Sequence, residues 1–170
     1  MEARVRLLGH PLHQSFVFVP LGFLTAAVAS DVAYLITRDP SWCPMAFRLM
    51  GIGIVAGLLA AVVGFLDWQR IPPGTRARRV GRMHGIGNFI VVVLFAASWM
   101  MRQGVANHVP DTLALVCGFA GFMLAGVTGW LGGELVSRLG VGVSDDANLN
   151  APSSLTVDTP SRTTTRDAAA

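Results

Sequence analysis

Residues 45–68 read MAFRLMGIGIVAGLLAAVVGFLDW, and this stretch decides the fold class. It carries only two charged side chains, Arg48 near its start and Asp67 near its end. A hydrocarbon core about 30 Å thick takes roughly 20 helical residues to cross, so a run of this length predicts a transmembrane helix. Its many glycines and alanines are typical of helices that approach one another closely inside a membrane.

Three further stretches have the same character, which predicts an all-α fold, a four-helix transmembrane bundle of two hairpins. The expected spans are residues 12–37, 45–68, 82–101 and 109–131. Over the whole chain 52% of residues are hydrophobic, only 14% are charged, and the mean hydropathy is +0.54. A soluble domain needs more polar surface than this. We therefore expect one membrane domain over residues 1–143, with the lipid bilayer as its partner.

The composition changes at Ser144, after which Ser, Thr, Asp, Pro and Ala dominate. Such a segment has too little apolar surface to offset the entropy of ordering it. We expect residues 144–170 to form a disordered cytoplasmic tail.

All basic side chains are arginines, and their distribution predicts orientation rather than nucleic-acid binding. Arg4 and Arg6 precede the first span, and the other two connections hold only Arg38 and Arg102 at their edges. The central connection contains Arg70, Arg76, Arg78, Arg79 and Arg82. The positive-inside rule then places this loop and both termini in the cytoplasm. Anionic lipid headgroups are the general partner of such a basic loop, with a specific ligand as the alternative.

Small and polar residues follow one face of each expected helix and predict the face that meets other helices. In the second span they are Gly53, Gly57, Ala60, Gly64 and Asp67, and in the fourth they are Gly121, Ala125, Gly129 and Gly133. In the first and third spans this face runs from His13 to Asp31 and from His84 to Arg102, about 27 Å of helix in each case. Asp31 and Arg102 fall at one depth, so we expect them to form an ion pair.

The two halves of the membrane domain resemble each other. Each opens with a histidine, His13 or His84, and closes with a glycine-rich run that ends in an acid. These runs are GFLDW at 64–68, with Asp67, and GWLGGEL at 129–135, with Glu134. Such echoes suggest an internal duplication of one hairpin, and chance similarity between apolar helices is the alternative.

This topology brings five side chains to the cytoplasmic level of the bundle, and they form the candidate site. They are His10, His13, Asp67, His84 and Glu134. Imidazole together with carboxylate suits a divalent metal such as iron, zinc, manganese or copper, and His13 with His84 suits bis-imidazole ligation of haem b. Two other interpretations stay open, in which the histidines only donate structural hydrogen bonds or form a proton relay.

Two functions follow from these alternatives. One is a small membrane redox or electron-transfer component that binds haem b or a metal. The other is a non-catalytic membrane scaffold or accessory subunit whose histidines are structural. The sequence shows no nucleophile and base pair that would mark an enzyme, and it indicates neither enzymatic activity nor an oligomeric state.

Four motifs resemble an uncharacterised bacterial membrane-protein family, domain of unknown function 2231. They are GHPLH at 9–13, GFLDW at 64–68, HGIGN at 84–88 and GWLGGELVSRLGVGV at 129–143. The resemblance implies a multi-pass protein of the bacterial cell (inner) membrane. Some relatives carry a Rieske iron–sulfur domain, which implies a redox setting and a Rieske-type or other redox partner. Relatives often have a histidine in the stretch where this chain has Leu139, and if that histidine is a ligand in them, the ligand set is depleted here.

Overall fold

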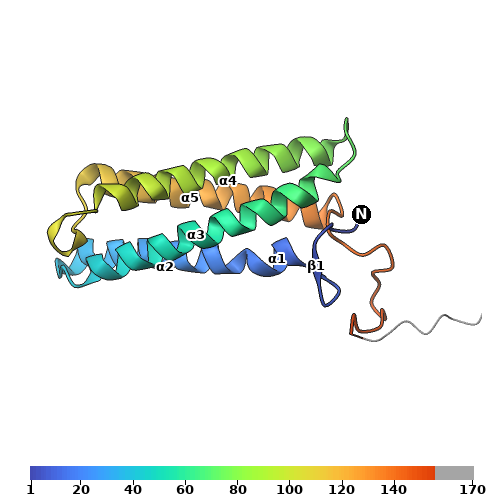
Figure 1. The fold of residues 1–170 in the computed structure, drawn as a ribbon, viewed down its shortest axis with the longest axis horizontal. Helices are drawn as coiled ribbons and strands as arrows, with labels where there is room; N and C mark the ends of the chain where they lie inside the picture. The colour runs from blue at the N-terminus through green and yellow to red at the C-terminus, as the bar shows by residue number, and fades with distance from the viewer. Residues whose placement is uncertain (156–170) are drawn as a thin grey trace, which may run out of the picture.

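The computed structural model describes residues 1–155, and four long helices dominate it (Figure 1). In chain order the elements are β1 Arg6–Leu7, β2 His10–Pro11, α1 Leu12–Phe16, α2 Phe18–Thr37, α3 Trp42–Gln69, α4 Arg76–Met101, η1 Ala106–His108 and α5 Thr112–Ser137. Four helical stretches, with α1 and α2 counted as one, are long and apolar enough to cross a membrane. The predicted four-helix membrane fold is therefore confirmed.

The first span has the predicted bounds, whereas the other three helices differ from the prediction at their ends. Helix α4 begins at Arg76 rather than at Arg82, because Thr75 caps it by accepting a hydrogen bond from the Arg78 N–H at 3.2 Å. Helix α5 begins at Thr112, where the Asp111 carboxylate accepts from the Ala114 N–H at 2.7 Å. Hydropathy alone therefore placed the start of the third span too late and the start of the fourth span too early, because neither polar cap shows in the apolar pattern.

The first span is interrupted at Val17, between α1 and α2. Pro20 follows within one turn and has no N–H to donate to the carbonyl of Phe16, so the regular hydrogen-bond ladder fails at this point. The short helix α1 that precedes the interruption carries His13. The interruption therefore separates the segment that holds this histidine from the long helix behind it.

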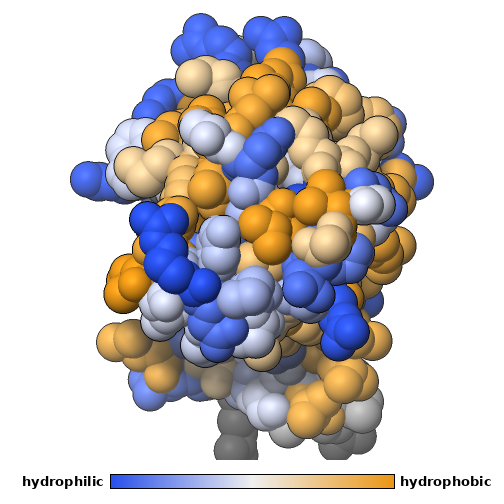
Figure 2. All heavy atoms as spheres, turned by 90° about the vertical axis from the view of Figure 1, so that its left-hand side faces the viewer, coloured by the Kyte–Doolittle hydropathy of each residue, from blue (hydrophilic) through white to orange (hydrophobic). Residues whose placement is uncertain are grey.

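Helices α2 and α3 pack together as one hairpin, and α4 and α5 as the other, with a further interface between α3 and α4 and a slighter one between α2 and α5. The core between them contains Leu24, Ala27, Val28, Met50, Val91 and Phe95. Both chain connections within the hairpins lie at one end of the bundle, where Figure 2 shows hydrophilic side chains interspersed with hydrophobic ones. We call this the ion-pair end, after Asp31 and Arg102.

The opposite end, which we call the histidine end after His13 and His84, holds the N-terminus, the α3–α4 connection and the segment after α5 (Figure 1). Strands β1 and β2 form a two-residue antiparallel ladder there, around a turn in which Leu8 and Gly9 have φ of 52° and 84°. No pattern in the sequence predicts this small hairpin. It leads the chain directly into α1.

Residues 144–155 of the predicted tail form turns and neither helix nor strand, while residues 156–170 lie outside the described residues. The described part contacts the N-terminal segment. The Ser144 hydroxyl donates to the Glu2 carboxylate at 3.0 Å, and the N-terminal ammonium of Met1 lies 3.2 Å from the Asp145 carboxylate. The beginning of this segment is therefore held against the N-terminal segment.

In each hairpin, a side chain of the first helix packs against a glycine of the second helix at corresponding positions. Leu24 of α2 lies against Gly53 of α3, and Phe95 of α4 lies against Gly121 of α5. The histidines also lie against glycines, His13 against Gly64 and His84 against Gly132, and the two glycines of each helix have the same spacing. These matched positions support the internal duplication that the sequence suggested.

Candidate functional site

His13 is held against α3 by one hydrogen bond and one close contact. Its Nδ1 lies 3.0 Å from the carbonyl oxygen of Ala60. Its ring covers Gly64, where an added Cβ would come within 2.8 Å of the ring. Any side chain at position 64 would push the imidazole away, so the glycine is what lets α1 and α3 approach here.

His84 makes the same pair of contacts on α5. Its Nδ1 lies 2.8 Å from the carbonyl oxygen of Thr128, and its ring lies over Gly132, where an added Cβ would be 3.1 Å away. The spacing from Thr128 to Gly132 on α5 equals the spacing from Ala60 to Gly64 on α3. Each hairpin thus presents one histidine in the same setting.

The two imidazoles face each other across the histidine end, with ring centroids 6.3 Å apart and ring planes at 87°. A carbonyl oxygen can only accept a hydrogen bond, so each neutral ring must carry its proton on Nδ1. The lone pair of each ring is then on Nε2. This is the tautomer that a histidine adopts when Nε2 binds a metal and Nδ1–H is fixed by a carbonyl.

The two Nε2 atoms differ in their partners. The side-chain amide of Asn88 donates to Nε2 of His84 at 3.1 Å. The amide is oriented by Thr128, whose buried hydroxyl donates to the Asn88 oxygen at 3.0 Å. Among the residues described, His13 makes its only side-chain hydrogen bond through Nδ1. Its Nε2 is therefore the free lone pair of the site.

Asn88 and Thr128 were not predicted as site residues. The signal for Asn88 was its position one helical turn after His84, on the same face. Thr128 offered a weaker signal, a hydroxyl residue one turn before Gly132 in a run otherwise made of glycine and apolar residues.

The three other candidates do not join this pair. The Asp67 carboxylate accepts from the backbone N–H groups of Arg4 and Val5, at 2.7 and 3.2 Å, and so fixes the N-terminal segment to α3. Glu134 forms an ion pair with Arg76 at 2.7 Å. His10 is exposed, with Nε2 3.2 Å from the Ser154 hydroxyl. Within residues 1–155 no three His, Cys, Asp or Glu side chains form a group that could hold a metal ion.

At the ion-pair end, the expected pairing of Asp31 with Arg102 is present. Two parallel hydrogen bonds of 2.6 and 2.7 Å join the guanidinium to both carboxylate oxygens. Arg102 is 0% exposed and Asp31 is 2% exposed. Arg102 also donates to the Ser98 hydroxyl, which donates in turn to the carbonyl of Ala114 on α5. This network joins both hairpins across the bundle.

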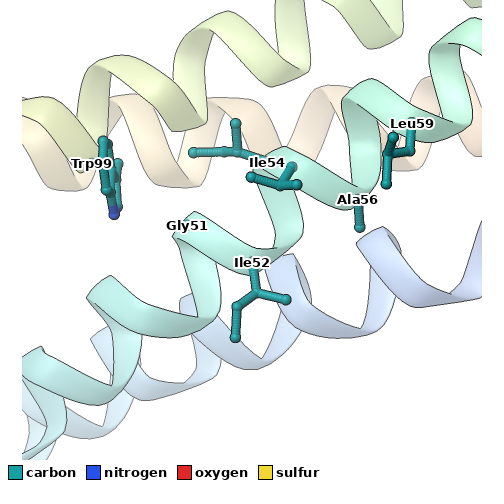
Figure 3. A pocket seen from close by; sticks show the side chains of 7 residues that line it. Gly51, Ile52, Ile54, Ala56, Leu59 and Trp99 are labelled. Carbon is teal, nitrogen blue, oxygen red and sulfur yellow. The ribbon is translucent and has the colours of Figure 1, made fainter.

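An apolar groove of about 530 Å³ runs along α3 next to Trp99 of α4 (Figure 3). Its lining consists of Gly51, Ile52, Ile54, Val55, Ala56, Leu59 and Trp99. The one polar atom of note is the buried Nε1 of Trp99, which has no hydrogen-bond partner within the described part of the chain. This lining offers neither a metal ligand nor a nucleophile, so the histidine pair is the stronger candidate for chemistry.

Comparison with known proteins gives a family and no function. The family described as predicted membrane protein (DUF2231) matches residues 9–145, which include both histidines and all four long helices up to Ser137. No curated protein and no solved structure matches the chain. Because the match covers most of its length, the chain belongs to the DUF2231 family of predicted membrane proteins.

Proposed function

We propose that this membrane protein is a small redox component that binds haem b or a transition-metal ion between His13 and His84. The observation that carries the proposal is the tautomer. Both Nδ1 atoms are committed to backbone carbonyls, at 3.0 and 2.8 Å, which leaves Nε2 of each facing ring as the ligand atom.

The residues fit a two-histidine site better than a five-ligand one. Bis-imidazole ligation of haem needs only the two rings and no carboxylate. Asp67 and Glu134 are engaged with the N-terminal segment and with Arg76, so they act in this proposal as supports of the surrounding helices. To free Nε2 of His84, the Asn88 amide must give up its hydrogen bond. A bound haem, iron, manganese or copper would supply one-electron transfer, whereas zinc would not, because Zn²⁺ is redox-inactive. A Rieske-type or other redox partner belongs to the same proposal.

A spectrum and a metal analysis test the proposal directly. The full chain is purified in detergent from cells supplied with iron, zinc, manganese and copper, and is scanned for a Soret band before and after dithionite. We expect haem or a stoichiometric metal in the wild type and its loss in His13→Ala and His84→Ala. His10→Ala is the matched control, because His10 is exposed and lies outside the pair. Wild-type protein with neither haem nor a redox-active metal would overturn the proposal, and zinc alone would count against a redox function.

The second candidate function is a non-catalytic scaffold or accessory subunit in which the histidines are structural. The observation that favours it is the chain of hydrogen bonds from Thr128 to Asn88 to His84, which uses both ring nitrogens of one histidine within the bundle. On this proposal His84→Ala lowers stability in a protein that never held a cofactor. The same spectrum and metal analysis therefore distinguish the two functions.

The orientation belongs to the proposal as well: the histidine end faces the cytoplasm of a bacterial inner membrane. The central Arg-rich connection lies at this end, together with Arg4 and Arg6, whereas Arg102 at the other end is neutralised by Asp31. Reporter fusions at Gly74 and at Asn107 test it. We expect alkaline phosphatase to be inactive at Gly74 and active at Asn107, and the reverse pattern would contradict the orientation.

A further inference from the structure

The connection between α3 and α4 folds around a pocket of about 370 Å³ at the histidine end. Its lining consists of Trp68, Pro73, Gly74, Thr75, Arg78, Arg79 and Arg82. Three of these residues carry a guanidinium group and none carries a carboxylate. The pocket therefore has a strong positive charge with no acid in its own wall.

One arginine is built into the wall of the pocket. The guanidinium of Arg78 lies over the indole of Trp68, 4.4 Å from the ring centroid, and donates to the backbone carbonyls of Ile71 and Gln69. The indole N–H of Trp68 donates back to the carbonyl of Arg78 at 3.1 Å. These contacts hold the guanidinium in place through neutral groups, so its charge is not cancelled.

The other two arginines are free to meet a ligand. Arg79 and Arg82 are exposed, and neither side chain has a hydrogen bond or an ion pair within residues 1–155. The acids at the ends of α3 and α5 are already used, Asp67 by backbone N–H groups and Glu134 by Arg76. The pocket also lies at the N-terminus of α4, whose helix dipole favours an anion. The arrangement lacks a negative partner.

The surroundings of the pocket indicate what kind of anion it meets. Phe65 stacks on Trp68 from the α3 side, with ring centroids 5.9 Å apart, and is itself 55% exposed. On α4, Met83 follows Arg82 and is 58% exposed. An exposed apolar surface, which includes Phe65 and Met83, thus lies next to the arginines of the pocket. A ligand with a phosphate group and an attached hydrocarbon chain matches both surfaces at once.

We propose that this pocket binds the phosphate group of an anionic phospholipid, with the acyl chains lying along α3 and α4 next to Phe65 and Met83. Guanidinium groups bind phosphate through paired N–H donors, which suits Arg79 and Arg82. The site is separate from the histidine pair and does not depend on whether a cofactor binds there.

Native mass spectrometry of the full chain in detergent tests the proposal. Phosphatidylglycerol and phosphatidylcholine with identical acyl chains are titrated, and the affinity of the first bound lipid is compared. We expect phosphatidylglycerol to bind at least about tenfold more tightly. Equal affinity for the two lipids would overturn the proposal, whatever the behaviour of any variant.

A matched pair of double variants locates the site. Arg79→Gln with Arg82→Gln should weaken phosphatidylglycerol binding by about 30-fold, since each arginine near a headgroup contributes roughly a fivefold factor. Arg38→Gln with Arg48→Gln makes the same charge change among exposed arginines outside the pocket and should leave the affinity within about twofold. An equal loss in both double variants would show a diffuse charge effect and contradict the pocket.

Inorganic phosphate and glycerol 1-phosphate distinguish a lipid from a free anion. We expect neither to displace phosphatidylglycerol at millimolar concentration, because neither provides the acyl chains that contact the apolar surface. Displacement by either compound would overturn the lipid assignment and identify a soluble phosphate as the ligand. Circular dichroism of each variant checks that the helices are retained, and the comparison of the two lipids on the wild type needs no variant.

Discussion

The two hairpins share a framework and differ in the polar groups placed on it. Each holds a histidine over a glycine, with Nδ1 on the carbonyl one turn before that glycine. In the second hairpin Asn88 and Thr128 add a hydrogen-bond chain, and the corresponding positions of the first hairpin are Val17 and Ala60. The repeat therefore fixes where side chains lie, while single substitutions decide which ring nitrogen is left free.

At the ion-pair end, corresponding positions of the two hairpins hold different side chains that contact each other. Asp31 and Arg102 occupy corresponding positions of the two hairpins, and their charges are opposite. Two equal charges at these positions would repel each other in the core, whereas Asp31 and Arg102 form a buried bidentate pair. Divergence after a duplication can thus turn a repeated position into the contact that joins the repeats.

The largest effect we expect comes from breaking this contact. Asp31→Leu leaves the guanidinium of Arg102 buried without its partner, which should lower the free energy of unfolding by about 3–5 kcal/mol. The combination of Asp31→Leu with Arg102→Leu should recover most of the loss, because no isolated charge remains. Unfolding by sodium dodecyl sulfate, followed by far-UV circular dichroism, measures both. A double variant as unstable as the single one would show that the pair itself provides the stability.

The next effect compares the glycines under the two histidines. Gly64→Ala places a Cβ 2.8 Å from the ring of His13 and should cost about 1–3 kcal/mol of unfolding free energy. Gly132→Ala should cost less, because its Cβ would lie 3.1 Å from His84. Gly129→Ala is the control, since an added Cβ there meets no heavy atom within 4 Å. If all three variants unfold alike in the same titration, the close approach of the rings is not what these glycines provide.

A smaller effect should follow from making the second hairpin resemble the first. Asn88→Val, which copies Val17, removes the donor to Nε2 of His84 and the acceptor of the Thr128 hydroxyl, and should cost about 1–2 kcal/mol. Nitrogen-15 NMR of labelled histidine should show the Nε2 resonance of His84 moving to that of an acceptor without a hydrogen bond. Val17→Ala should leave the His84 resonances in place. Unchanged His84 resonances in Asn88→Val would contradict the proposed hydrogen bond.

The smallest effect concerns the acids that close the two hairpins. Glu134 pairs with a half-exposed arginine, so Glu134→Gln should cost only about 0.5 kcal/mol and the cost should fall further in high salt. Asp67→Ala should cost more, because two backbone N–H groups of the N-terminal segment lose their acceptor. The same detergent titration at low and high salt separates the two. Equal costs would mean that Asp67 does not anchor the N-terminal segment.

The sequence predicts at which end of the bundle most site residues lie, but not which of them contact one another. Chain direction alone places His10, His13, Asp67, His84 and Glu134 at one end, because two helices start and two end there. It does not say how each helix is rotated about its axis. The sequence pattern put Gly129 and Gly133 on the inner face of α5, but both are exposed and an added Cβ at either meets nothing within 4 Å. Gly132 and Thr128 face His84 instead, so that part of the predicted face was wrong.

The sequence by itself determined the four spans, the likeness of the two halves and the pairing of Asp31 with Arg102. The spans follow from length and hydropathy, the likeness of the halves follows from repeated motifs, and the pairing follows from the depth of the two residues and the cost of a lone charge in lipid. The sequence also brought His13 and His84 together as a candidate pair. Only the tertiary structure decided that a backbone carbonyl holds each ring through Nδ1, that Asp67 and Glu134 are engaged elsewhere, and that the arginines line a pocket. One residue step rotates a helix by about 100°, and faces made of glycine and alanine are too alike for the sequence to choose between them.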